Sequence, residues 1–188
     1  PTASGKTEAA FIPALNSVED WETGLKVLYV SPLKALINDQ FQRISELSEY
    51  LDIPITRWHG EVSQTQKRKV VNQPKGILLI TPESIEGMLV NRPGEAEHLF
   101  KGVEWIIIDE LHSFLGTERG IHLQSLLQRI SRFMQAPRFI AMSATLNKKD
   151  FGYSKAFFGS PRHTDILVDR VKNDLLITID YTSGESGP

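Results

Sequence analysis

Two short groups of residues have the types and spacing that phosphate chemistry needs, and 103 positions separate Lys6 of the first group from Asp109 of the second. The first lies in residues 2–8 (TASGKTE), where small residues let backbone N–H groups curl around phosphate oxygens. Lys6 can then reach the outer phosphates, and the Thr7 hydroxyl can bind Mg²⁺ at the start of a helix whose dipole favours anions. The full loop pattern has a small residue five positions before Gly5, so we expect the chain to begin inside this motif.

The second group is the adjacent pair of carboxylates Asp109 and Glu110, which directly follows an apolar run at residues 105–108 (WIII). In a nucleotide-hydrolysing site, the first carboxylate helps to hold Mg²⁺ and the second orients or deprotonates the attacking water. Each group alone has a simpler interpretation, because Gly-Lys-Thr also occurs at ordinary helix N-termini and Asp-Glu also forms solvated turns. The two groups together favour the chemical interpretation.

Short apolar runs predict the strands that position these groups. They are continuous rather than alternating, as expected for strands covered by helices on both faces. The four clearest runs are residues 26–30 (KVLYV), 76–80 (GILLI), 104–108 (EWIII) and 138–142 (RFIAM). We expect a fifth strand within residues 53–58 and note a weaker apolar run at 166–168. Helical spacing of apolar residues occurs at Phe41, Ile44, Leu47 and Leu51, and again at Ile121, Leu126, Ile130 and Phe133.

Strands that alternate with helices predict an α/β fold with a mostly parallel sheet. After each of the four clearest runs the sequence turns polar at once. The four polar segments are Ser31-Pro32, Thr81-Pro82, Asp109-Glu110 and Ser143-Ala144-Thr145. Because ligands of open parallel sheets bind outside the carboxyl ends of the strands, we expect these segments to meet at one edge of the sheet.

The composition sets further limits. A chain of 188 residues that is 40% hydrophobic and 23% charged fits one globular domain. The absence of cysteine excludes disulfides, a thiolate nucleophile and Cys-ligated metal centres. No apolar run approaches the roughly 20 residues of a membrane-spanning helix and no signal-peptide core is present, so we expect a cytoplasmic protein with no membrane partner. The formal net charge of −2 means that any contact with a polyanion depends on local geometry.

Taken together, these segments resemble the first RecA-like motor domain of superfamily 2 helicases of the DEAD/DEAH-like group, and most closely the large helicase-related family. Five motifs occur in the family's order: residues 2–7 (TASGKT) for motif I, 31–35 (SPLKA) with 36–40 (LINDQ) for motif Ia, 81–84 (TPES) for motif Ib, 109–112 (DELH) for motif II and 143–145 (SAT) for motif III. Residues 57–60 (RWHG) are similar to the segment between motifs Ia and Ib. Residues 119–129 (RGIHLQSLLQR) are similar to the large helicase-related branch.

The resemblance implies a three-layer α/β/α RecA-like P-loop NTPase domain at residues 1–168, truncated at its N-terminus within the phosphate loop. Residues 169–188 would be a linker or tail toward an absent second RecA-like domain. The implied cofactors are ATP and Mg²⁺. The family's ATP contacts fall on Thr2, Ala3, Ser4, Gly5, Lys6, Thr7, Glu8 and His112, its metal contacts on Thr7 and Asp109, and its catalytic groups on Lys6, Asp109 and Glu110.

The resemblance also implies a nucleic-acid partner, DNA in preference to RNA, held as one single strand. The contacts would come from backbone amides, a helix N-terminus and hydroxyl groups, which bind a strand without reading its bases. The matching residues are Pro32, Leu33, Lys34, Ala35, Gly60, Thr81, Pro82, Glu83 and Ser84. The residues that would couple the ATP site to the strand are His112, Ser143, Ala144 and Thr145.

The implied activity is that of an ATP-dependent helicase. The chain by itself is expected to show little activity, because the second domain would supply arginines that stabilise the transition state. Two alternatives stay open: a nucleic-acid-dependent ATPase that translocates without unwinding, and a non-catalytic nucleic-acid-binding module. A P-loop kinase for small molecules would not explain motifs Ia, Ib and III together.

Four further features of the sequence are a basic run, a histidine beside a glycine, two tryptophans and a proline within a predicted helix. Lys67-Arg68-Lys69 follows a helix-capping pattern and predicts a solvated helix face rather than a phosphate contact. His59 is expected either beside the strand groove or as a structural histidine with satisfied hydrogen bonds. Trp21 and Trp58 can stack on bases, although core packing is favoured for both. Pro13 is expected to kink the first helix or to end it early.

Overall fold

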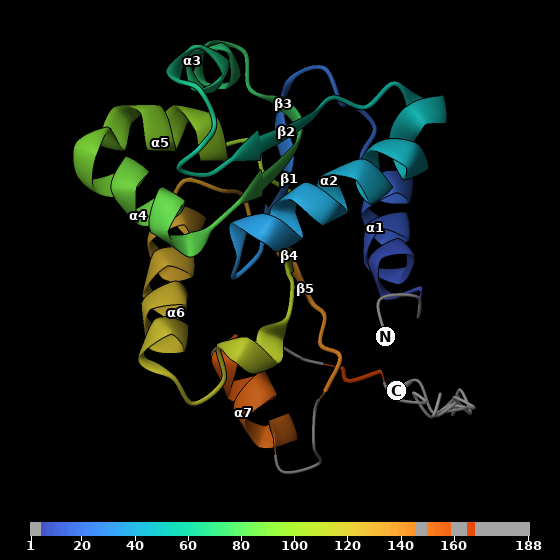
Figure 1. Cartoon of the computed structure of the whole chain (residues 1–188), viewed down its shortest axis with the longest axis vertical. Coiled ribbons are helices and arrows are strands. Elements are labelled where there is room, and N and C mark those ends of the chain that lie inside the picture. Colours follow the sequence, from blue (N-terminus) through green and yellow to red (C-terminus); the bar gives the residue numbers. More distant parts are fainter. Residues whose placement is uncertain (1–4, 146–149, 159–164, 168–188) are drawn as a thin grey trace, which may run out of the picture.

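The sheet has five strands, all paired in parallel, in the order β2-β3-β1-β4-β5 (Figure 1). The computed structural model describes residues 5–145, 150–158 and 165–167. Its strands are β1 (Gly24–Val30), β2 (Ile55–Trp58), β3 (Lys75–Ile80), β4 (Trp105–Ile108) and β5 (Arg138–Ala141). The five strands expected from the sequence are therefore confirmed within two residues at each end. Ile166 and Leu167 belong to no strand, and Val168 lies outside the described residues.

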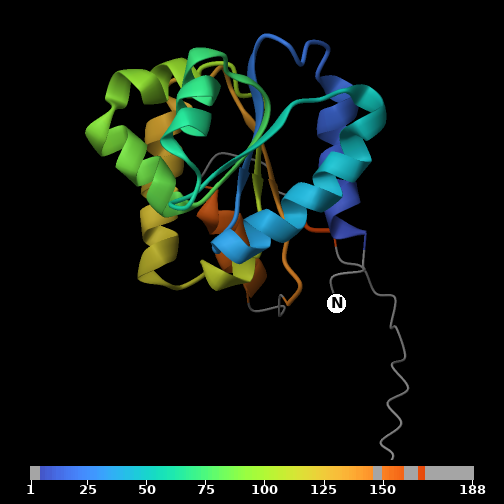
Figure 2. The ribbon, with the colours of Figure 1, turned by 45° about the horizontal axis from the view of Figure 1, so that its top comes forward.

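Helices cover both faces of this sheet (Figure 2). They are α1 (Lys6–Ser17), α2 (Lys34–Ser48), α3 (Gln64–Asn72), α4 (Pro82–Asn91), α5 (Pro93–Phe100), α6 (Glu118–Ser131) and α7 (Asp150–Phe157), with short 3₁₀ turns η1 (Glu49–Leu51) and η2 (Leu111–Ser113). None of the helices in the described part of the chain is long and apolar enough to cross a membrane.

Successive side chains along a strand pack alternately into two separate hydrophobic cores, one on each face of the sheet. Leu78 and Ile80 of β3 pack with residues of α4, α5 and α6, whereas Ile77 and Leu79 pack with residues of α1 and α2. Each fully buried aliphatic side chain stabilises the fold by roughly 1.5–3 kcal/mol, and this two-sided demand explains the continuous apolar runs. The predicted three-layer α/β/α architecture is confirmed.

The strands end in register. Trp58, Ile80, Val30, Ile108 and Ala141 lie opposite one another across the whole sheet, in the order of the strands. The hydrogen-bonded ladder continues one residue further, since Ser31 N donates to Ile80 O and Asp109 N donates to Val30 O. The polar residues that follow each strand are thus delivered to the same edge, as expected.

Helix α1 does not end at Pro13 but continues to Ser17, so the prediction of an early end is wrong. Proline removes the hydrogen bond that its backbone nitrogen would make to Ala9 O. Ala9 and Pro13 both line a cavity of about 830 Å³.

The side chains of Trp58 and Trp21 pack in the interior, which confirms core packing for both. Trp58 belongs to one core, and Trp21 is partly buried against the other. Helix α3 has no buried residue, so the basic run at Lys67 to Lys69 lies on a solvated helix as expected. Within it, the Lys67 ammonium lies 5.8 Å from the centroid of the Trp58 ring.

Gly76 is required where β3 begins. Its φ is +68°, a conformation that side chains disfavour, and a Cβ placed there would lie 1.9 Å from Pro54 O. The next backbone nitrogen, Ile77 N, donates to that same carbonyl at 2.8 Å, which fixes the close approach. The chain entering β2 and the chain entering β3 therefore touch at a point that has no room for a side chain.

We expect Gly76→Ala to lower the free energy of unfolding of this domain by roughly 2–4 kcal/mol, because it adds both backbone strain and a steric clash. Urea unfolding followed by circular dichroism measures the loss. Gly87→Ala is the matched control: Gly87 lies within α4, no atom lies within 4 Å of its added Cβ, and helix propensity predicts a gain of about 0.5–1 kcal/mol. Similar stabilities for the two variants would contradict the prediction.

Candidate active site

The carboxylate of Asp109 is buried directly after β4, with only 7% of the residue exposed. Tyr29 Oη donates to Asp109 Oδ2 at 2.5 Å, and Glu110 N donates to Asp109 Oδ1 at 2.9 Å. Burial raises the pKa of Asp109, while the Tyr29 hydrogen bond and the nearby Lys6 charge oppose the rise. Lys6 is therefore among the charged groups that act on the Asp109 carboxylate.

Tyr29 is itself fully buried in β1 and stacks on Phe11 of α1, with ring centroids 5.7 Å apart. Burial and the neighbouring charge of Asp109 raise the pKa of the Tyr29 hydroxyl, so this hydroxyl keeps its proton and donates it. The tyrosine therefore fixes the orientation of the Asp109 carboxylate.

Residues 109–112 form a tight turn, the acidic turn. Glu110 has φ +47° and ψ +48°, a left-handed conformation that costs a non-glycine residue roughly 1–2 kcal/mol. Its Oε2 lies 3.1 Å from His112 Nδ1, which in turn lies 3.0 Å from Ser143 Oγ. Leu111 N donates to Met142 O at 2.8 Å. The acidic turn and the segment at 143–145 are therefore in direct contact, with Ala144 and Thr145 exposed beside it.

The N-terminus of α1 is held by α2. Gly5 precedes α1 with φ +67°, the left-handed conformation that glycine adopts without strain. The Thr7 hydroxyl donates to Gln40 Oε1 at 3.1 Å, and Arg43 Nη2 lies 2.9 Å from Glu8 Oε1. A hydrogen bond from its own backbone N–H lowers the pKa of Glu8; burial opposes this and Arg43 adds to it.

Thr2, Ala3 and Ser4, predicted to complete the phosphate loop, lie outside the described residues. The described part of the loop runs from Gly5 into the first turn of α1.

Two helix N-termini lie side by side at the same edge, because β1 and β3 pair and end together. The loop at 31–35 leads into α2, and its residues Leu33, Lys34 and Ala35 are exposed while Pro32 is buried. The loop at 81–84 leads into α4, where Thr81 Oγ1 lies 3.0 Å from Ser84 Oγ, Pro82 is the first helical residue and Glu83 is exposed. Unpaired N–H groups and the helix dipole make each N-terminus attractive to phosphate.

The end of β2 adds a buried histidine to this edge. His59 is 5% exposed, burial lowers its pKa, and neither ring nitrogen has a hydrogen-bond partner in the described part of the chain. Its burial agrees with a structural histidine, but the expected satisfied hydrogen bonds are not observed. The next residue, Gly60, is exposed, and Glu61 forms an ion pair with Lys34.

Sequence reasoning missed four residues that hold the site: Tyr29, Gln40, Arg43 and Arg119. Only Tyr29 gave a usable signal, because a buried hydroxyl within an aliphatic run needs a hydrogen-bond partner. Gln40, Arg43 and Arg119 sit on helix faces that tertiary packing brings to the site. Their partners come from other helices, loops and strand ends, so local spacing did not indicate them.

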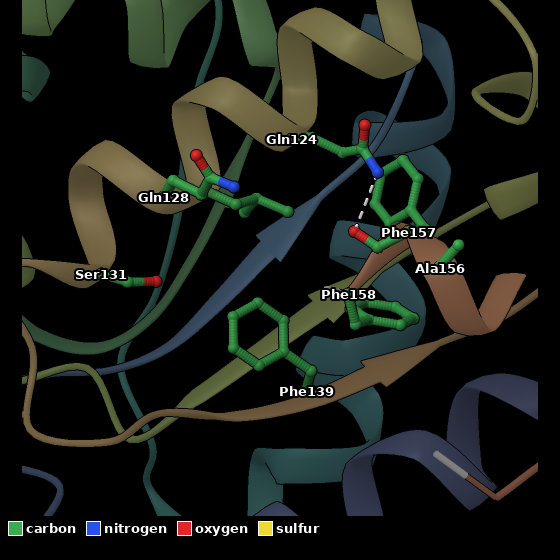
Figure 3. A pocket seen from close by; sticks show the side chains of 8 residues that line it. Gln124, Gln128, Ser131, Phe139, Ala156, Phe157 and Phe158 are labelled. Atoms are coloured by element: carbon green, nitrogen blue, oxygen red, sulfur yellow. Dashed lines mark hydrogen bonds between the residues drawn. The ribbon is translucent and has the colours of Figure 1, made fainter. Parts of the chain in front are cut away.

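A pocket of about 310 Å³ lies elsewhere, between α6, β5 and α7 (Figure 3). Phe139, Phe157 and Phe158 form its aromatic wall, and Gln124 Nε2 donates to Phe157 O at 3.0 Å. No residue predicted to bind nucleotide or nucleic acid lines it. The larger cavity beside α1 includes Ser143 and Leu111 and so borders the acidic turn.

A parallel α/β sheet with a phosphate-type loop before α1 and a buried carboxylate after β4 defines a P-loop NTPase domain of RecA-like fold. The model of the DEAD/DEAH box helicase family matches residues 1–151. This chain therefore belongs to the DEAD/DEAH box helicase family.

Its relatives include ATP-dependent helicase Lhr-Core protein 2 of Thermococcus barophilus, which is 33% identical over 221 residues, or 99% of this chain and 25% of that protein. The structure of Mycobacterium smegmatis helicase Lhr bound to ssDNA and AMP-PNP is similar, with a TM-score of 0.67 and 34% identity, over 79% of this chain and 20% of that chain. The structure of DUF1998 helicase MrfA bound to DNA and AMPPNP is also similar, with a TM-score of 0.72 and 30% identity, over 85% of this chain and 23% of that chain. The chain spans about a fifth to a quarter of these relatives.

We expect Asp109→Asn to make the ligand-free domain less sensitive to rising pH. Because burial raises the pKa of Asp109, folding favours the neutral acid. This contribution to stability is complete below the pKa of the unfolded chain and is lost as pH rises through the higher pKa of the folded state. Asparagine carries no charge, so the unfolding free energy of the variant should fall less between about pH 4 and pH 7. Urea unfolding across this range measures the difference.

Tyr29→Phe provides the opposite test. It removes the hydroxyl that lowers the pKa of Asp109, so the loss of stability with rising pH should become larger than in the parent chain. If all three proteins showed the same pH dependence, the proposed electrostatic role of this hydrogen bond would be wrong.

Proposed function

We propose that this chain is the ATP-binding motor domain of an ATP-dependent helicase that couples hydrolysis to translocation on nucleic acid and its unwinding. The contact between the acidic turn and the 143–145 segment, through His112 and Ser143, carries this proposal. It joins the acidic turn after β4 to the segment after β5, at the same edge of the sheet where β1 and β3 lead into the N-termini of α2 and α4. The similar Lhr and MrfA structures contain DNA together with AMP-PNP or AMPPNP.

On the ATP side, Lys6 and the backbone N–H groups around Gly5 and Thr7 would bind the phosphates, with Glu8 held by Arg43 behind them. Mg²⁺ fits the described donors. Thr7 gives its proton to Gln40, which leaves hydroxyl lone pairs for a cation, and Asp109 supplies a buried carboxylate. When bound, the cation would neutralise charge on the transferred phosphoryl group.

Glu110 is the base in this proposal. Its backbone is left-handed, and its Oε2 lies 3.1 Å from His112 Nδ1. Glu110 would accept a proton from the attacking water, while His112 would relay the state of the site to Ser143. Because the coupling contacts come from two strand ends that pair, a small shift of the acidic turn must displace the 143–145 segment.

Nucleic acid would bind at the loops at 31–35 and 81–84 and at the exposed Gly60. These residues would hold the sugar-phosphate backbone of one strand of DNA. A second RecA-like domain of the same polypeptide would close on ATP and supply the arginines of the transition state. Coverage of only a fifth to a quarter of the relatives leaves room for that domain in proteins of this kind. By itself the chain of 188 residues should therefore hydrolyse ATP poorly.

We expect Glu110→Gln, made in the full-length protein, to lower kcat for ATP hydrolysis by about 10²–10⁴-fold, as loss of a general base does. Binding of a fluorescent ATP analogue should change little, since glutamine keeps the shape of the side chain. A coupled ATPase assay with and without single-stranded DNA gives the rates. The exposed Glu19→Gln is the control and should behave as the parent protein.

Hydrolysis by the parent protein that does not respond to any nucleic acid would refute the helicase proposal. Stimulated hydrolysis without strand separation would instead assign a translocase. Robust hydrolysis by residues 1–188 alone would overturn the expectation that a second domain is needed.

The preference for DNA gives a separate prediction. ssDNA should stimulate ATP hydrolysis at a lower concentration than ssRNA of the same sequence, because the similar structures of Lhr, at 34% identity, and MrfA, at 30%, are described with DNA. Half-activating concentrations, measured at one salt concentration, provide the comparison, since salt alone changes such affinities strongly. Equal or lower values for ssRNA would reject the DNA preference.

A further inference from the structure

Arg119 connects the two proposed strand-binding loops. It lies in the first turn of α6, and its Nε and Nη2 both donate to Glu83 Oε1, at 2.9 and 2.6 Å. Nη2 also donates to Pro32 O at 2.5 Å. One guanidinium group therefore holds the loop at 31–35 and the loop at 81–84 at a fixed separation.

The same side chain also contacts the segment that follows the acidic turn. The Arg119 guanidinium lies 5.6 Å from the centroid of the Phe114 ring, two residues beyond His112. Thr117 Oγ1 donates to Phe114 O at 2.9 Å and accepts from Gly120 N at 3.0 Å. A Cβ on Gly120 would lie 1.8 Å from Phe114 O, so the start of α6 packs directly on Phe114, two residues beyond the acidic turn.

The chemistry of Arg119 suits this position. Its planar guanidinium can donate to a carboxylate and a carbonyl at once, which a lysine ammonium cannot do with the same geometry. Glu83 is 59% exposed by side chain and lies at the N-terminus of α4, where its charge would repel a phosphate. Arg119 offsets that charge while holding the helix start in place.

We propose that Arg119 is a positioning residue that couples the acidic turn to nucleic-acid binding by holding both strand-binding loops in their binding geometry. This inference rests on the proposed function. Movement of the acidic turn displaces Phe114 and the start of α6, and Arg119 transmits the displacement to Pro32 and Glu83. Arg119 does not itself contact the strand.

Another Arg–Glu pair between the same two helices offers a matched control. Arg129 Nη1 lies 2.8 Å from Glu86 Oε2, on the same helices α6 and α4, with similar exposure of the arginine. The partner of Arg129, Glu86, lies within α4 and outside residues 31–35 and 81–84. Arg129→Ala therefore removes an ion pair of the same type without touching the proposed connection.

The experiment compares Arg119→Ala, Arg119→Lys and Arg129→Ala in the full-length protein. For Arg119→Ala we expect the ssDNA concentration that half-activates ATP hydrolysis to rise about tenfold, within the usual range of coupling between two sites. Arg119→Lys should recover only part of the loss, and Arg129→Ala should stay within about twofold of the parent. Thermal unfolding of each protein reports any general loss of stability.

Salt dependence separates positioning from direct contact. Loss of a phosphate contact reduces the slope of log affinity against log salt by about 0.7 for a single strand, whereas loss of a positioning residue leaves the slope unchanged. A reduced slope for Arg119→Ala, or equal half-activating concentrations for the Arg119→Ala and Arg129→Ala proteins, would overturn the proposal. If Arg119→Ala does not fold, the half-activating concentration of Arg119→Lys decides, and a value equal to that of the parent would overturn the proposal, since lysine keeps the charge but not the simultaneous contact with Glu83 and Pro32. Failure of the proposed function itself would look different, because the parent protein would then show no stimulation by ssDNA.

Discussion

The common end row of the five parallel strands is the constraint on which the rest of the structure depends. Hydrogen-bonded register places Trp58, Ile80, Val30, Ile108 and Ala141 in one line. Since side chains alternate between the two faces of a sheet, a shift of one residue in any strand would exchange its two core faces as well as move its polar end. The two apolar cores therefore enforce the arrangement of the polar edge, although neither core takes part in the chemistry.

The polar edge of the sheet carries energetic costs that the apolar part of the sheet does not. Asp109, Ser31, Thr81 and His59 are all buried there, and burial of polar groups is unfavourable unless hydrogen bonds replace water. Asp109 gains two donors, but Ser31 Oγ and both His59 ring nitrogens have none among the described residues. Glu110 adds a left-handed backbone. Such costs gather at functional sites because the rest of the fold can hold them in place.

The sequence predicted what depends on local pattern. Continuous apolar runs located the strands within two residues, because two-sided burial leaves no polar face to interrupt them. It did not predict that α1 continues past Pro13 to Ser17, because tolerance of a lost helix hydrogen bond depends on the packing around it. Nor could it pair Thr7 with Gln40, or Arg119 with Pro32, because these contacts join segments that only the tertiary fold brings together. The residues proposed to do chemistry were visible in the sequence, whereas those that orient them were not.

The charge of the strand-binding edge follows from the same arrangement. Two of its cations already face carboxylates, since Lys34 pairs with Glu61 and Arg119 pairs with Glu83. What remains for a phosphate backbone is the pair of helix N-termini at α2 and α4, each equivalent to about half a positive charge. These dipoles are fixed in direction by the sheet, and Arg119 offsets the opposing charge of Glu83 in the first turn of α4. Contacts of this kind hold a backbone without reading bases.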